Sequence, residues 1–203
     1  MRSKHTLRDA ALALLLLGVA TAARGTAQHG GDSLFSVVAA AGGGYAQYVA
    51  PYDPAFDINR NGAALTLRVM WHPDHLLRVG LETGWSRMYA YTLKDVQTPF
   101  GPTQTSLGLS AIPMLLVFSM PVLPRVQLFG GTGVYYMNSR TRSFGTIVDV
   151  REFSQGWMLA GAYAFPVSRG ADVSLELKWL GATQFEDAVL TLQVLGSLRL
   201  LEW

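Results

Sequence analysis

Six charged residues of this chain occupy alternate positions within apolar segments, where a charged side chain needs a partner. They are Arg68, Arg78, Glu82, Glu176, Lys178 and Arg199. Successive side chains of an extended chain point to opposite faces, so each charge lies opposite a face of Leu, Val or Trp. An unpaired buried charge is very costly. If their face is buried, the six residues are therefore predicted to form ion pairs.

Two functions fit such an interior set of charges. In the first, static ion pairs plug the inside of a closed sheet and hold it shut. In the second, the same residues gate a narrow pore for ions or small solutes, and Glu82 exchanges arginine partners as the pore opens. An eight-stranded barrel encloses a space just wide enough for side chains to fill, which favours the plug.

Metal chemistry has two incomplete candidates. Residues 57–62 match the first half of a calcium loop, but Arg68 stands at position twelve, where a bidentate glutamate is required. His72 and His75 flank a Pro-Asp turn and supply too few ligands for a zinc site. Ordinary turn chemistry accounts for both segments. The sequence therefore predicts no metal and no cofactor.

Long strands are the elements that would position these residues. Residues 77–91, LRVGLETGWSRMYAY, alternate between an apolar face and a face of charged, glycine and serine residues. Soluble strands usually have about five or six residues, whereas a tilted strand needs about 9–11 to cross a bilayer. A segment of this length predicts a transmembrane strand.

Eight such segments follow one another along the chain. They lie near residues 34–48, 63–72, 77–91, 105–120, 126–137, 153–165, 173–179 and 190–200. Long loops are predicted at residues 49–62, 92–104 and 138–152, with short turns between them. Even strand numbers and this alternation are typical of outer-membrane barrels. The sequence predicts one all-β domain, an eight-stranded antiparallel up-and-down transmembrane β-barrel with both termini on the short-turn side.

The N-terminus has the features of an export signal. Residues 1–27 combine a basic start, an apolar core and small residues before a cleavage site after Ala27. They hold four of the 16 basic and one of the 14 acidic residues, so residues 28–203 have a formal charge of −1. The sequence pI of about 9.0 is therefore no indication of nucleic-acid binding. The chain has no cysteine, which excludes disulfides and thiolate metal sites.

A longer pattern resembles a known family. Residues 107–136, LGLSAIPMLLVFSMPVLPRVQLFGGTGVYY, contain an Ile-Pro pair before an apolar run, a short turn and a glycine-rich strand. This hairpin resembles the signature of the bacterial outer-membrane protein β-barrel domain family, which is similar to the small OmpA/OmpX-type barrels. The resemblance implies a bacterial outer-membrane location, contact with outer-membrane lipid and insertion by the barrel-assembly machinery.

Members of this family end on an aromatic residue that the assembly machinery reads, and Trp203 occupies that place. Trp203 shares the parity of the inward residues of the last strand, such as Gln193 and Arg199. Its expected outward position therefore requires either a bulge near Glu202 or a departure of the last residues from the strand ladder.

The predicted function is non-catalytic. We expect a monomeric structural or adhesion-type protein whose outer loops contact ligands, surfaces or lipid, although these loops could equally be merely solvated. The narrow pore is the alternative. A lipid-modifying enzyme is a weaker one, because His72 and His75 lie at a short turn and such enzymes carry a Ser/His pair on the outer side. A secreted soluble barrel would need the two faces reversed.

Overall fold

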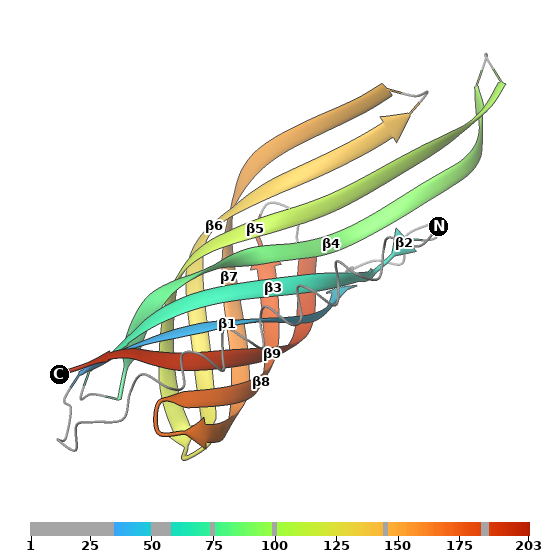
Figure 1. Ribbon diagram of the computed structural model, residues 1–203. Helices are drawn as coiled ribbons and strands as arrows, with labels where there is room; N and C mark the ends of the chain where they lie inside the picture. The colour runs from blue at the N-terminus through green and yellow to red at the C-terminus, as the bar shows by residue number, and fades with distance from the viewer. Residues whose placement is uncertain (1–34, 50–57, 74–75, 99–100, 144–145, 184–186) are drawn as a thin grey trace.

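The computed structural model describes residues 35–49, 58–73, 76–98, 101–143, 146–183 and 187–203. The strands are β1 (Ser36–Val49), β2 (Ile58–Asn59), β3 (Asn61–His72), β4 (Arg78–Thr98), β5 (Gly101–Leu123), β6 (Val126–Ser143), β7 (Thr146–Ser168), β8 (Ala171–Ala182) and β9 (Asp187–Glu202). Each long strand pairs antiparallel with the long strands before and after it, and β1 pairs with β9 to close the ring (Figure 1). The two-residue β2 pairs with β4. The predicted eight-stranded up-and-down barrel is confirmed.

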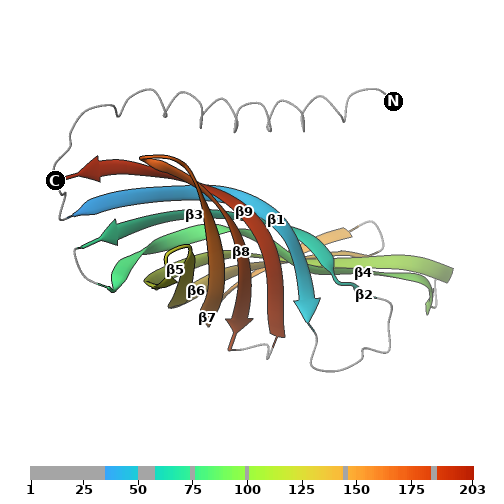
Figure 2. The same ribbon diagram turned by 90° about the horizontal axis from the view of Figure 1, so that it is seen from below.

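Both ends of the described chain lie at one end of the barrel, which we call the short-turn end. Ser36 at the start of β1 pairs with His72 at the end of β3 and with Glu202 at the end of β9. Figure 2 shows the C-terminus beside the start of β1. The opposite end is called the hairpin end. The predicted export signal, residues 1–27, lies outside the described residues.

The side chains alternate between the lumen and the outside as predicted. On β3, Leu65, Leu67 and Val69 are exposed, whereas Thr66 and Arg68 are buried. The soluble barrel with reversed faces is therefore excluded. A closed barrel with an apolar outer surface satisfies its backbone internally and suits a bilayer. β3 and β8 have 12 residues each, enough to cross one. Within the described part of the chain, no helix is long and apolar enough to span a membrane.

The predictions of long loops at residues 92–104 and 138–152 are wrong. β4 continues to Thr98 and β5 begins at Gly101. In the same way, β6 continues to Ser143 and β7 begins at Thr146. Pairing between β5 and β6 also extends to the hairpin end. These four strands therefore form a sheet that extends beyond the other strands, and we call this part the projecting sheet (Figure 1). Strands surrounded by water on both faces need no apolar alternation, so the sequence pattern disappears although the backbone pairing continues.

The C-terminus contains the bulge that was one of the two predicted alternatives. Val37 pairs with Leu201 and Val38 pairs with Arg199, so Leu200 is an extra residue in β9. The shift turns Leu201 and Trp203 outward, and both are exposed.

A stability measurement tests the close packing of β5 against β6. A Cβ at Gly133 would clash with the carbonyl oxygen of Met114 and lie 2.9 Å from Cα of Leu115. We expect Gly133→Ala to lower the free energy of unfolding by about 1–3 kcal/mol, because the two strands must separate. Gly108→Ala is the control, since a Cβ there has nothing within 4 Å. Urea unfolding in lipid vesicles, followed by tryptophan fluorescence, compares them; equal stabilities would contradict the predicted clash.

Candidate functional site

Four of the six predicted charged residues meet in the middle of the barrel. Arg68 comes from β3, Glu82 from β4, and Glu176 and Lys178 from β8, and all four side chains are buried. Arg68 and Glu82 are cross-strand partners, while Glu176 and Lys178 are two positions apart on one face of a strand. We call these four residues the lumen network.

Arg68 holds both carboxylates of the lumen network. Its Nε donates to Oε2 of Glu82 at 2.6 Å, and its Nη1 and Nη2 donate to the two oxygens of Glu176 at 2.8 and 2.9 Å. Such a bidentate pair is among the stronger and more directional hydrogen bonds of proteins. The guanidinium carbon also lies 4.1 Å from the centre of the Phe129 ring, a cation–π contact.

Lys178 completes the lumen network from the other side of the barrel. Its Nζ lies 2.6 Å from Oε1 of Glu82, 3.2 Å from Oε1 of Glu176 and 3.0 Å from Oγ1 of Thr66. Three strands separate β4 from β8 in either direction around the ring, so the Glu82–Lys178 bond spans the lumen. Two cations and two carboxylates leave the lumen network formally neutral.

Uncharged side chains extend this set of hydrogen bonds to β9. Thr66 Oγ1 donates to Oε1 of Gln193 at 2.7 Å, and Gln193 Nε2 donates to Oγ1 of Thr191 at 3.0 Å. Neither threonine was among the residues predicted to form the interior site. Strand alternation could have predicted that they face the lumen, since Thr66 shares its face of β3 with Arg68.

An apolar layer covers the lumen network on the side of the hairpin end. Its buried side chains include Met88, Tyr135, Leu180 and Val189. The cavity among them measures about 10 Å³, which is at the lower limit for a single water molecule. This layer separates the lumen network from the projecting sheet.

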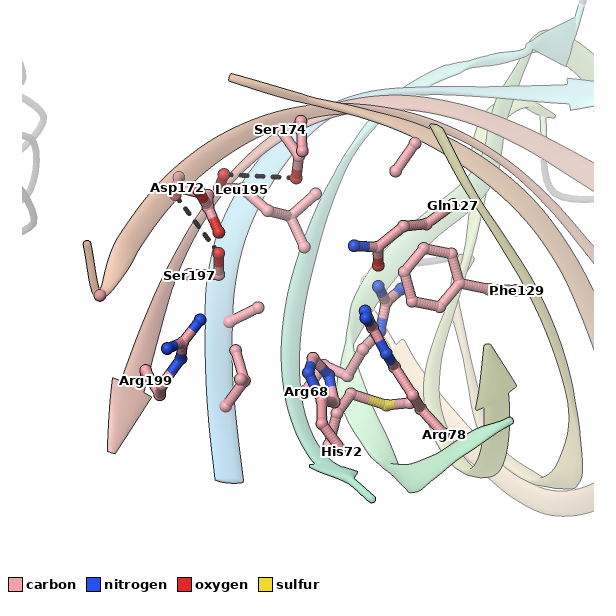
Figure 3. Close-up of a pocket in the computed structure, with 16 residues that line it drawn as sticks. Arg68, His72, Arg78, Gln127, Phe129, Asp172, Ser174, Leu195, Ser197 and Arg199 are labelled. Atoms are coloured by element: carbon pink, nitrogen blue, oxygen red, sulfur yellow. Dashed lines mark hydrogen bonds between the residues drawn. The ribbon is translucent and has the colours of Figure 1, made fainter. Parts of the chain in front are cut away.

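A larger cavity, which we call the chamber, lies between the lumen network and the short-turn end (Figure 3). Its volume is about 210 Å³, and its walls include His72, Arg78, Gln127 and Arg199. Arg78 and Arg199, both predicted to join the lumen ion pairs, therefore lie apart from the lumen network. Arg78 is the first residue of β4, and Arg199 lies beside the β9 bulge, where it pairs with Glu202.

The described polar groups of the chamber do not assemble a nucleophilic pair. Ser174 donates to the carbonyl oxygen of Leu195 at 3.5 Å, and Ser197 donates to that of Asp172 at 3.4 Å. His72 lines the same cavity without a hydrogen bond to either serine among the described residues.

The two metal candidates are only partly described. Asp57 and His75 lie outside the described residues. Asn59 Oδ1 accepts a hydrogen bond from the backbone N–H of Asn61 at 3.0 Å, and Asn61 Oδ1 accepts one from the Tyr45 hydroxyl. Within the described ranges, no group of three His, Cys, Asp or Glu side chains is placed to hold a metal ion.

Comparisons with known proteins rest on structure alone. No family model matches the chain, and no curated protein matches it. The structure is similar to that of Ail, the attachment invasion locus protein of Yersinia pestis, with 11% identity, 82% of this chain and 98% of that chain covered, and a TM-score of 0.53. Neisserial surface protein A has 12% identity, covers 83% and 98% of the two chains and gives a TM-score of 0.49. The chain therefore has the fold of the small eight-stranded outer-membrane β-barrels.

Proposed function

We propose that this protein is a non-conducting, non-catalytic, monomeric outer-membrane barrel that contacts ligands or surfaces through its projecting sheet. The observation that carries the proposal is the extension of β4–β7 beyond the barrel. We further propose that residues 1–27 are a cleaved export signal and that the exposed Trp203 is read by the barrel-assembly machinery. These roles follow from the predicted leader and from the position of Trp203 at the lipid-facing end of β9.

The projecting sheet offers an accessible strand edge. Residues 146–153 of β7 are exposed, and their described ladder partners are all on β6. A strand edge of this kind exposes backbone N–H and C=O groups, to which an extended peptide can add as a further strand. Ile147, Val148 and Phe153 are exposed along it and provide apolar contacts for such a partner.

An exposed ion pair connects β6 and β7 in the projecting sheet. Arg140 Nε donates to Oδ1 of Asp149 at 2.8 Å, and the two residues face each other across the strands. This hydrogen bond lowers the pKa of Asp149 below its usual value. Asp149 therefore stays ionised at neutral pH, and the hairpin presents charges of both signs beside its apolar residues.

The structural relative supports this role only through its fold. Ail is named for attachment and invasion. The proposal for this chain rests on its own projecting sheet, and the non-catalytic part rests on the chamber, where neither Ser174 nor Ser197 is hydrogen-bonded to His72 among the described residues. The plug is preferred to the pore because the lumen network is neutral and fully paired. In addition, the apolar layer on its hairpin-end side has almost no room for water.

Shortening one hairpin tests the contact surface. Deletion of residues 140–149 removes the outer part of the β6–β7 hairpin and leaves the paired barrel segments of both strands. We expect cells that display this variant to lose adhesion to protein-coated surfaces, because residues 146–149 of the exposed edge, with Ile147 and Val148, are removed. The barrel itself should still change gel mobility between unheated and boiled samples. Unchanged adhesion with a folded barrel would contradict a contact role for this hairpin.

Charge substitutions test the lumen network. Glu176→Gln leaves Arg68 and Lys178 with one shared carboxylate, and we expect it to lower the free energy of unfolding by about 3–5 kcal/mol. The neutral double variant Glu176→Leu, Lys178→Met should lose less, because it removes one charge of each sign. Asp149→Asn, in the exposed pair, is the control and should change stability little. Urea unfolding in vesicles makes the comparison, and equal effects of Glu176→Gln and Asp149→Asn would refute the role of burial.

Conductance separates the plug from the pore. In a planar bilayer we expect no open level under voltage from the wild-type barrel, because the apolar layer and the lumen network block a water column. The measurement is repeated with Glu82→Ala, which removes the acceptor shared by Arg68 and Lys178. A steady wild-type open level whose size or gating changes in Glu82→Ala would establish the pore instead.

A further inference from the structure

We propose that the chamber at the short-turn end binds a small oxyanion, with phosphate as the representative ligand. Three features support this site: an unpaired guanidinium, a wall of hydrogen-bond donors and a cavity of suitable size. The site is separate from the projecting sheet, so it does not depend on the proposed contact function.

Arg78 supplies the uncompensated positive charge. Its side chain is half-buried and lines the chamber, and among the described residues it has no hydrogen bond or ion pair. Arg68 also borders the chamber, but its charge is matched within the neutral lumen network. Arg199 lines the chamber as well, and its charge is shared with Glu202. A half-buried guanidinium with no carboxylate partner among the described residues is best satisfied by an anion from solution.

The donors converge on one side of the chamber. Figure 3 shows Arg78 from β4 and Gln127 from β6 extending toward one another, with His72 on the same side. Asp172, the one carboxylate among the described residues of the lining, lies on the other side beside Ser197. An oxyanion between Arg78 and Gln127 therefore receives charge-assisted and neutral hydrogen bonds while it avoids Asp172.

The chamber is large enough for the ligand and closed behind it. Its volume is about 210 Å³, and one water molecule occupies about 30 Å³ of liquid, so a hydrated tetrahedral oxyanion fits. The lumen network and the apolar layer lie beyond it, toward the hairpin end. The geometry therefore suits retention of an anion from the compartment at the short-turn end, rather than its passage through the barrel.

Phosphate binding to the full barrel, folded in uncharged detergent, tests the site. Equilibrium dialysis at fixed ionic strength, with chloride replacing phosphate, should give saturable binding of one phosphate per chain. Arg78→Gln should weaken the affinity by about tenfold or more, because it removes a charge-assisted hydrogen bond. Asp172→Asn should strengthen binding, because it removes the negative charge on the opposite wall of the chamber. A gain of affinity cannot come from misfolding.

The matched control is Arg125→Gln, an exposed arginine in the turn between β5 and β6 at the same end, which does not line the chamber. It should bind phosphate as the wild type does, and heat-dependent gel mobility should show every variant folded. The proposal is overturned if the folded wild type shows no saturable binding, or if Arg78→Gln and Arg125→Gln have the same affinity.

Nanodiscs distinguish a free anion from a lipid headgroup. Equal phosphate affinity in uncharged detergent and in phosphatidylcholine discs, whose lipid carries a headgroup phosphate, would assign the chamber to an anion free in solution. A lower apparent phosphate affinity in the discs than in detergent would assign it to the headgroup phosphate, which then competes with phosphate for Arg78. Either result supports the oxyanion site, provided that binding depends on Arg78.

Discussion

The buried pairing of Arg68 and Lys178 with Glu82 and Glu176 is the interaction on which the inside of this barrel depends. Burying four charges is costly, and their mutual attraction offsets this cost only when every donor and acceptor is matched. The bidentate Arg68–Glu176 pair and the Glu82–Lys178 bond across the lumen meet that condition. Glycine and alanine at neighbouring inward positions leave room for these long side chains. The lumen network therefore determines which side chains fill the barrel and keeps its opposite walls together.

This pairing divides the molecule into two ends with different chemistry. Toward the hairpin end, the apolar layer closes the lumen, and the four longest strands continue outward as the projecting sheet. Toward the short-turn end, the barrel opens into the chamber, whose charged wall residues are mostly basic. Contact with partners and binding of a small anion are thus separated by the neutral lumen network. Neither proposed activity requires a solute to cross the barrel.

The strands are predictable from the sequence wherever one face meets lipid and the other the lumen, and the prediction was wrong where both faces meet water. Residues 77–86 alternate because lipid and lumen impose opposite requirements on adjacent side chains. Residues 138–152 have no such constraint, so their charged and turn-forming residues indicated a loop although β6 and β7 remain paired. The first strand posed the opposite difficulty. Its run of Ala and Gly is small on both faces, and only pairing with β3 and β9 assigns Gly42 and Gly44 to the lumen side.

The sequence by itself determined the class of fold, the number of long strands and the face to which each charged residue belongs. A period of two residues is a local property of the extended chain, so it can be read without knowing any partner strand. The tertiary structure alone decided which of those charges meet. Strand register, the stagger of the closed ring and the bulge at Leu200 set the height of each side chain in the barrel. Arg78 and Arg199 share the inward parity of Arg68, but they lie closer to the short-turn end of the barrel. They therefore line the chamber, while Arg68 joins the lumen network.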